Sequence, residues 1–122
     1  MSKINSFEDI QAWQNAQDLA NNIYELSGTG KFCDDYALKD QIRKAAVSIP
    51  SNIAEGFARE TNQEFVRFLF IAKGSTAEVQ SQLYTAKSQN YITEDKFDEL
   101  YQQLEVISKQ LSKFITYLKN AD

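Results

Sequence analysis

Any catalytic or metal-binding chemistry in this sequence would have to depend on carboxylates. Histidine is absent and Cys33 is the single cysteine, which excludes Ser-His and Cys-His nucleophile pairs and the Glu-x-x-His ligands of di-iron bundles. Four carboxylates near the middle of the chain could form a metal centre of oxygen ligands: Glu55, Glu60, Glu64 and Glu78. Exposed helix faces and helix caps explain most of them more simply. We expect no catalytic residue, metal or cofactor, and keep a carboxylate-dependent metalloenzyme as the least favoured alternative.

Basic side chains are the second group that could recognise a ligand. Residues 39–73 contain six basic and four acidic residues, whereas the whole chain has a formal net charge of -4. Five of these bases are candidates for contacting the phosphates of RNA or DNA, or the carboxylates of a protein: Arg43, Lys44, Arg59, Arg67 and Lys73. The alternative is a solvated helix face, on which Ser48 or Asn52 bonds to backbone groups freed by Pro50. The acidic net charge argues against direct RNA binding by the molecule as a whole.

Helices must position all of these residues, because apolar side chains recur at three- and four-residue steps along the chain. In the last predicted helix, Phe97, Leu104, Leu111 and Leu118 recur every seven residues. After a short tail (1–6), the pattern predicts helices over about 7–27, 35–57, 62–89 and 94–119. The predicted fold is an all-α, up-down-up-down antiparallel four-helix bundle, forming a single domain over 7–120.

The predicted second helix should be distorted before it ends. Pro50 lies inside its apolar face, and an interior proline removes one backbone hydrogen bond and clashes with the preceding turn. We therefore expect a kink or local re-bonding near residues 46–50. Gly56 would then allow a left-handed stop, and Thr61 with Glu64 would cap the next helix. The residues that define this kink and corner are Pro50, Asn52, Glu55 and Gly56.

The predicted third helix carries more apolar surface than one bundle face needs. A main stripe would fill the core, and a second, offset stripe consists of Val66, Phe70, Ala77 and Tyr84. A second apolar arc on a helix is typical of a partner surface. Gly74, Ser75 and Thr76 place small residues in mid-helix, where glycine costs about 1 kcal/mol relative to alanine, so we expect a close approach there. That approach would be either a tight helix crossing within one chain or a contact between subunits.

The remaining segments add two expectations. In the loop over 31–35, Phe32 should tuck under the end of the bundle, and Asp34 or Asp35 should cap the following helix. No apolar run reaches the roughly 20 residues that a membrane span needs, and the first residues lack the apolar core of a signal peptide. We expect a cytoplasmic protein that does not contact membranes.

The central segment also resembles a known family. The run from Asp40 to Phe57, followed by Glu64-Phe65, Phe68-Leu69, Ile71 to Ser75 and Glu78, is similar to the four-helix-bundle proteins encoded in intervening sequences of bacterial 23S ribosomal RNA genes. The accessory variability protein of diversity-generating retroelements looks like a relative. One departure is the segment around Phe32 and Cys33, where much of the family has a longer loop containing phenylalanine and proline.

The resemblance also implies an oligomeric state and binding partners, which the composition of the sequence does not indicate. Family members form ring-like homopentamers, and the retroelement relatives bind a reverse transcriptase and its RNA. By this resemblance we expect a non-catalytic oligomeric adaptor or scaffold with a nucleic-acid-binding surface. The alternative is a structural or protein-interaction module that binds no nucleic acid.

Overall fold

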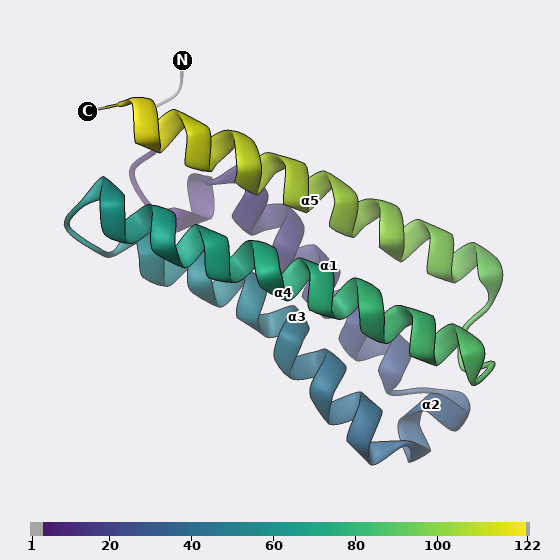
Figure 1. The fold of residues 1–122 in the computed structure, drawn as a ribbon. Coiled ribbons are helices and arrows are strands. Elements are labelled where there is room, and N and C mark those ends of the chain that lie inside the picture. Colours follow the sequence, from purple (N-terminus) through teal and green to yellow (C-terminus); the bar gives the residue numbers. More distant parts are fainter. Residues whose placement is uncertain (1–3, 122) are drawn as a thin grey trace.

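The computed structural model describes residues 4–121, and every regular element within that range is a helix. Four long helices build the molecule: α1 (Gln11–Ser27), α3 (Tyr36–Phe57), α4 (Asn62–Ser88) and α5 (Glu94–Asn120). Successive long helices run in opposite directions, so that α1 begins at the end of the bundle where α5 ends (Figure 1). Helix α1 packs between α3 and α5, and α4 packs between the same two helices on the other side. The described chain is therefore an all-helical bundle, as predicted.

The core is built from the predicted apolar stripes. The expected main stripe of α4 is buried along its whole length, from Phe65 to Ala86, and so is the heptad series of α5, from Phe97 to Leu118. Leu19, Ile49, Leu69 and their neighbours complete one continuous cluster through all four long helices. Burial of these stripes drives the helices together. None of the described helices combines the length and the apolarity that crossing a membrane requires.

The structure corrects two expectations near the beginning of the chain. The first predicted helix is divided: Phe7–Asp9 forms a 3-10 helix (η1), Ile10 is extended, and α1 starts only at Gln11. The Asp9 carboxylate accepts a hydrogen bond from the backbone N–H of Ser6 at 3.2 Å, so the acidic turn caps itself instead of opening α1. The segment expected as a loop contains a further short helix, α2 (Gly30–Asp34). Residues 1–3 of the predicted tail lie outside the described range.

The other three long helices start at capping side chains of the kind predicted from the sequence. Asp35 rather than Asp34 caps α3, because its Oδ1 accepts from the backbone N–H of Leu38 at 3.1 Å. Thr61 caps α4 by accepting from Glu64 N at 3.2 Å, and Thr93 caps α5 in the same way. Phe32 is buried under the end of the bundle, where it stacks on Tyr91. These caps determine where the long helices start.

Gly56 rather than Gly74 is the glycine at a close approach between helices. Gly56 lies inside α3 without a positive φ, so it is not a left-handed stop. A Cβ at Gly56 would lie 2.8 Å from Phe65 Cδ1 and 2.8 Å from Phe68 Cβ, so the absence of a side chain lets α3 approach α4. A Cβ at Gly74 would meet nothing within 4 Å. The expected tight crossing within the chain therefore involves the neighbours of Gly74: Ser75 and Thr76 are buried, and the Ser75 hydroxyl lies 2.9 Å from that of Ser48 on α3. The contact between subunits at Gly74 remains a prediction.

Candidate nucleic-acid interface

The structure assigns Arg43 to the support of α1 rather than to a binding surface. Its Nε donates to the Ser27 hydroxyl at 2.8 Å, and its terminal NH2 donates to the Tyr24 carbonyl at 3.0 Å. The guanidinium carbon also lies 4.4 Å from the centre of the Tyr24 ring. A cation bonded to the last carbonyls of a helix satisfies groups that have no partner within the helix and complements its dipole. Arg43 is therefore a C-terminal cap of α1.

The remaining predicted bases do not form one continuous patch. Lys44 is exposed on α3, fifteen positions before Arg59, which corresponds to roughly 22 Å at the helical rise of 1.5 Å per residue. Lys73 is half-buried on α4. Neither lysine forms an ion pair with another residue in 4–121. The predicted bases are therefore spread along the length of the molecule, so only some of them can contact one ligand.

Two of the predicted bases do converge, at the corner between α3 and α4. The guanidinium carbon of Arg59 lies 4.7 Å from the centre of the Phe68 ring, and that of Arg67 lies 5.2 Å from the same centre. Phe68 itself is buried, so its ring holds both charges in place through cation–π attraction. Arg59 also pairs with Glu55 at 3.4 Å in an exposed i,i+4 contact, which contributes little to stability. The corner therefore presents two arginines, in a segment that also contains the carboxylates of Glu55, Glu60 and Glu64.

A third cation lies at the same end of the bundle, on the side of α4 that faces α5 (Figure 1). The Lys119 ammonium, near the end of α5, lies 5.2 Å from the centre of the Phe70 ring on α4, and 48% of the Phe70 surface is exposed. A shallow groove beside these residues is lined by Val66, Leu118 and Lys119 among others. Sequence reasoning missed Lys119 because its position beside α4 depends on the antiparallel register of α4 and α5. We call Arg59, Arg67 and Lys119, with the rings of Phe68 and Phe70, the basic corner.

The opposite end of the bundle has the other sign of charge. Helix α5 starts with Glu94, Asp95, Asp98 and Glu99, and α1 contains no lysine or arginine. The pKa of Lys87 is raised above its usual value, first by its hydrogen bond to Glu94, with burial acting in the opposite direction. The charge distribution is therefore polarised along the bundle, which allows a local anion-binding surface on a chain of acidic net charge.

Two of the four predicted carboxylates have a side-chain partner in the described residues. Glu55 pairs with Arg59, and Glu78 accepts from Gln82. Within residues 4–121, no three His, Cys, Asp or Glu side chains are grouped so that they could hold a metal ion. Asn52 donates to the Ser48 carbonyl at 2.7 Å, but the carbonyl that Pro50 deprives of its intrahelical partner is that of Ala46, so this bond is not the one predicted beside Pro50. Helix α3 remains continuous past Pro50.

The second stripe of α4 divides between the core and the surface. Val66 belongs to the core, so the structure places it away from the predicted subunit contact. Gly74 and Ala77 are exposed, and so are Phe70 and Tyr84. The Tyr84 ring also packs on Phe97 of α5, with ring centres 4.8 Å apart. We call Phe70, Gly74, Ala77 and Tyr84 the outer stripe: two aromatic residues that flank two small ones.

Comparisons with known proteins place the chain in a family. Residues 8–113 match the family model described as 23S rRNA-intervening sequence protein. A solved structure, a protein with unknown function from the S23 ribosomal protein family of Bacteroides thetaiotaomicron VPI-5482, is similar in fold, with a TM-score of 0.79 at 21% identity over 85% of this chain and 97% of that chain. No curated protein matches. Because the family model covers most of the sequence, the chain belongs to the 23S rRNA-intervening sequence protein family.

Proposed function

We propose that this protein is a non-catalytic, self-assembling adaptor whose basic corner binds an anionic partner, namely RNA, DNA or a nucleic-acid enzyme such as a reverse transcriptase. The observation that carries the proposal is the convergence of Arg59 and Arg67 on the Phe68 ring. Arginine is suited to phosphate because its planar guanidinium donates two parallel hydrogen bonds.

Self-assembly is the second part of the proposal, and the outer stripe of α4 supports it. Phe70 and Tyr84 each expose about half of their surface, at 48% and 52%. A Cβ at Gly74 would meet open space, so the chain alone gives no reason for a glycine there. A helix from a second copy could approach closely over Gly74 and Ala77, between the two aromatic residues. The resemblance suggests five copies in a ring, and we expect this assembly in the cytoplasm.

Binding is tested by fluorescence anisotropy with a single-stranded RNA probe and a DNA duplex at several salt concentrations. The wild-type protein should bind more weakly as salt rises, because phosphate contacts release counterions. Arg67→Glu combined with Lys119→Glu should abolish binding. Lys44→Glu serves as the matched control, because it changes an exposed base on α3 outside the basic corner, and it should bind like the wild type.

Two outcomes would contradict the nucleic-acid part of the proposal. The first is an absence of binding at low salt, and the second is an equal loss of affinity in the Lys44→Glu control. If self-assembly persisted in either case, the alternative of a protein-interaction module without nucleic-acid binding would replace it.

Assembly is tested by sedimentation velocity and light scattering at micromolar protein concentration. The expected mass is five times the 14.0 kDa of one chain. Phe70→Glu should reduce the mass to that of one chain, because a carboxylate would be buried at the contact without a partner. Val106→Glu on α5 is the control for an exposed apolar residue outside the outer stripe, and it should leave the assembly intact. A monomeric wild-type protein would overturn this part.

A further inference from the structure

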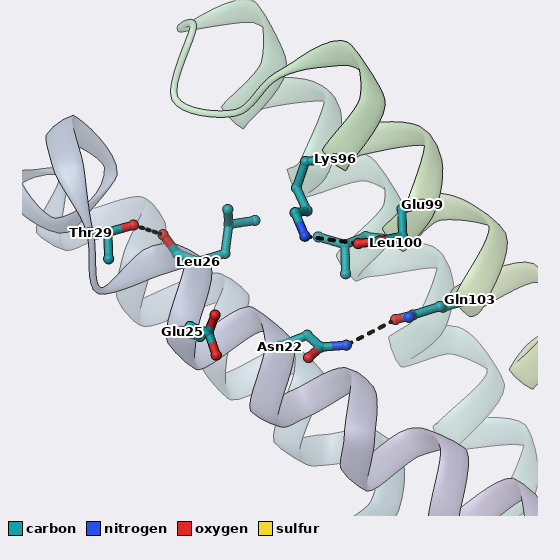
Figure 2. A pocket seen from close by; sticks show the side chains of 8 residues that line it. All are labelled: Asn22, Glu25, Leu26, Thr29, Lys96, Glu99, Leu100 and Gln103. Carbon is teal, nitrogen blue, oxygen red and sulfur yellow. Dashed lines mark hydrogen bonds and ion pairs between the residues drawn. The ribbon is translucent and has the colours of Figure 1, made fainter.

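A cleft lies between the end of α1 and the start of α5, at the end of the bundle away from the basic corner (Figure 2). Its volume is about 330 Å³, within the roughly 300–1,000 Å³ of small-ligand sites. The contact between α1 and α5 is the sparsest of those between neighbouring long helices, and the cleft occupies the part of this contact that remains open.

The lining of the cleft combines apolar surface with a polar rim. Leu26 of α1 is half-buried and provides accessible apolar surface, whereas Leu100 of α5 is only 1% exposed. The Asn22 amide donates to the Gln103 side chain at 3.3 Å, which bridges the two helices on one side of the cleft (Figure 2). Glu25 comes from α1 and Glu99 from α5. A ligand in this space would therefore meet carboxylates from both helices and the side chain of Leu26.

The charge of this region favours a cation. Residues 94–99 contain four acidic residues and one lysine, and α1 contains Asp18 and Glu25 but no basic residue. Lys96 supplies the single positive charge among the lining residues, and its ammonium donates to Glu99 at 2.8 Å. That hydrogen bond is the main reason that the pKa of Lys96 is raised, and the charge of Glu25 acts in the same direction. Glu25 forms no ion pair with any residue in 4–121.

We propose that this cleft binds an arginine side chain of a partner protein, whose guanidinium lies between Glu25 and Glu99. The aliphatic stem of the arginine would pack on Leu26, as long basic side chains do when they cover apolar surface. Lys96 then acts as an internal competitor, which satisfies Glu99 while the cleft is empty and moves aside when the guanidinium enters. The cleft shares no lining residue with the basic corner or the outer stripe, so this inference does not depend on the proposed function.

The experiment titrates isotope-labelled protein with N-acetyl-arginine amide and follows backbone amide resonances by NMR. The arginine compound should shift the amides of residues 22–29 and 96–103, with an affinity in the millimolar range. N-acetyl-citrulline amide has nearly the same shape without the charge, and it should bind at least threefold more weakly. Equal binding of the two compounds, or no shift of these amides, would overturn the proposal.

Three variants and one control determine which charges matter. Glu25→Gln and Glu99→Gln should each weaken binding of the arginine compound up to about fivefold, the factor that corresponds to an exposed ion pair. Lys96→Met should strengthen binding, because the competing ammonium is lost. Glu78→Gln makes the same charge change on α4, outside the cleft, and should leave the affinity unchanged. Unchanged binding in both glutamate variants, or weaker binding in Lys96→Met, would contradict the assignment.

Discussion

The Tyr91 hydroxyl donates a hydrogen bond to the Asp35 carboxylate at 2.9 Å and so joins the loop between α4 and α5 to the start of α3. The other oxygen of the same carboxylate caps α3, and the Tyr91 ring stacks on Phe32 of α2. One tyrosine thus connects three segments that are distant in the sequence.

Tyr91→Phe should lower the midpoint of thermal unfolding while it keeps the ring stacked on Phe32. The hydrogen bond to Asp35 is the main cause of the raised pKa of Tyr91. A group whose pKa is raised by folding stabilises the protein fully below its unfolded pKa, here about 10, and loses that contribution as the pH rises through the folded value. The difference between variant and wild type should therefore be constant at neutral pH and shrink above about pH 10. A difference that grows with pH would contradict this linkage.

Alanine should have opposite effects at the two helical glycines. Gly56→Ala places a Cβ against Phe65 and Phe68, so it should reduce the free energy of unfolding by about 1–3 kcal/mol. Gly74→Ala places a Cβ in open space and should raise the free energy of unfolding by about 0.5–1 kcal/mol through helix propensity. Urea denaturation of both variants at low protein concentration measures the two values. The same sign at both positions would reject this account of the glycines.

Arg43→Met should destabilise the fold without weakening nucleic-acid binding. The substitution leaves the Ser27 hydroxyl and the Tyr24 carbonyl without the guanidinium that donates to them, and the expected loss is about 1–2 kcal/mol. Lys44→Met changes the next residue, which is exposed, and should stay within about 0.5 kcal/mol of the wild type. Denaturation and RNA anisotropy on the same samples separate the two roles. A stable Arg43→Met protein that no longer bound RNA would restore the original prediction.

The hydroxyls of Ser48 and Ser75 should be energetically coupled. They lie 2.9 Å apart between α3 and α4, and Asn52 also donates to Ser48 Oγ. Each single change to alanine should cost about 1 kcal/mol, and the double variant should cost less than the sum, because the second change no longer breaks an intact bond. A double-mutant cycle from urea denaturation measures the coupling. Strict additivity would show that the hydroxyls act independently.

Local rules were sufficient for the helices and most of their ends. Heptad spacing located the core residues of α5, and the caps at Asp35, Thr61 and Thr93 follow from side chains that accept backbone hydrogen bonds within three residues. The incorrect prediction of one continuous first helix also has a local cause. Ile10 interrupts the first helix, because Asp9 is drawn back to the N–H of Ser6, and the pattern of apolar residues gives no sign of that break.

The candidate site was predictable only in part, because it depends on contacts between helices. Sequence spacing grouped Arg43 with Arg59, although Arg43 turns toward the end of α1. It could not place Lys119 beside Phe70, since that contact follows from the register of α4 against α5. Gly56 and Gly74 illustrate the same difficulty. Both are poor helix formers, but only the packing of Phe65 and Phe68 against α3 shows that Gly56 is the one that permits a close approach.

The uneven contacts around the bundle also determine how it comes apart. The α3–α4 pair makes the most extensive contact, with Gly56 against Phe65 and Phe68, whereas α1 and α5 make the sparsest. Amide groups in α3 and α4 should therefore exchange their hydrogens with solvent only through global unfolding, while those of α1 exchange earlier, when that helix detaches. Native-state hydrogen exchange at low denaturant would measure this order. The α3–α4 hairpin, which carries Arg59 and Arg67, is thus the most persistent part of the molecule.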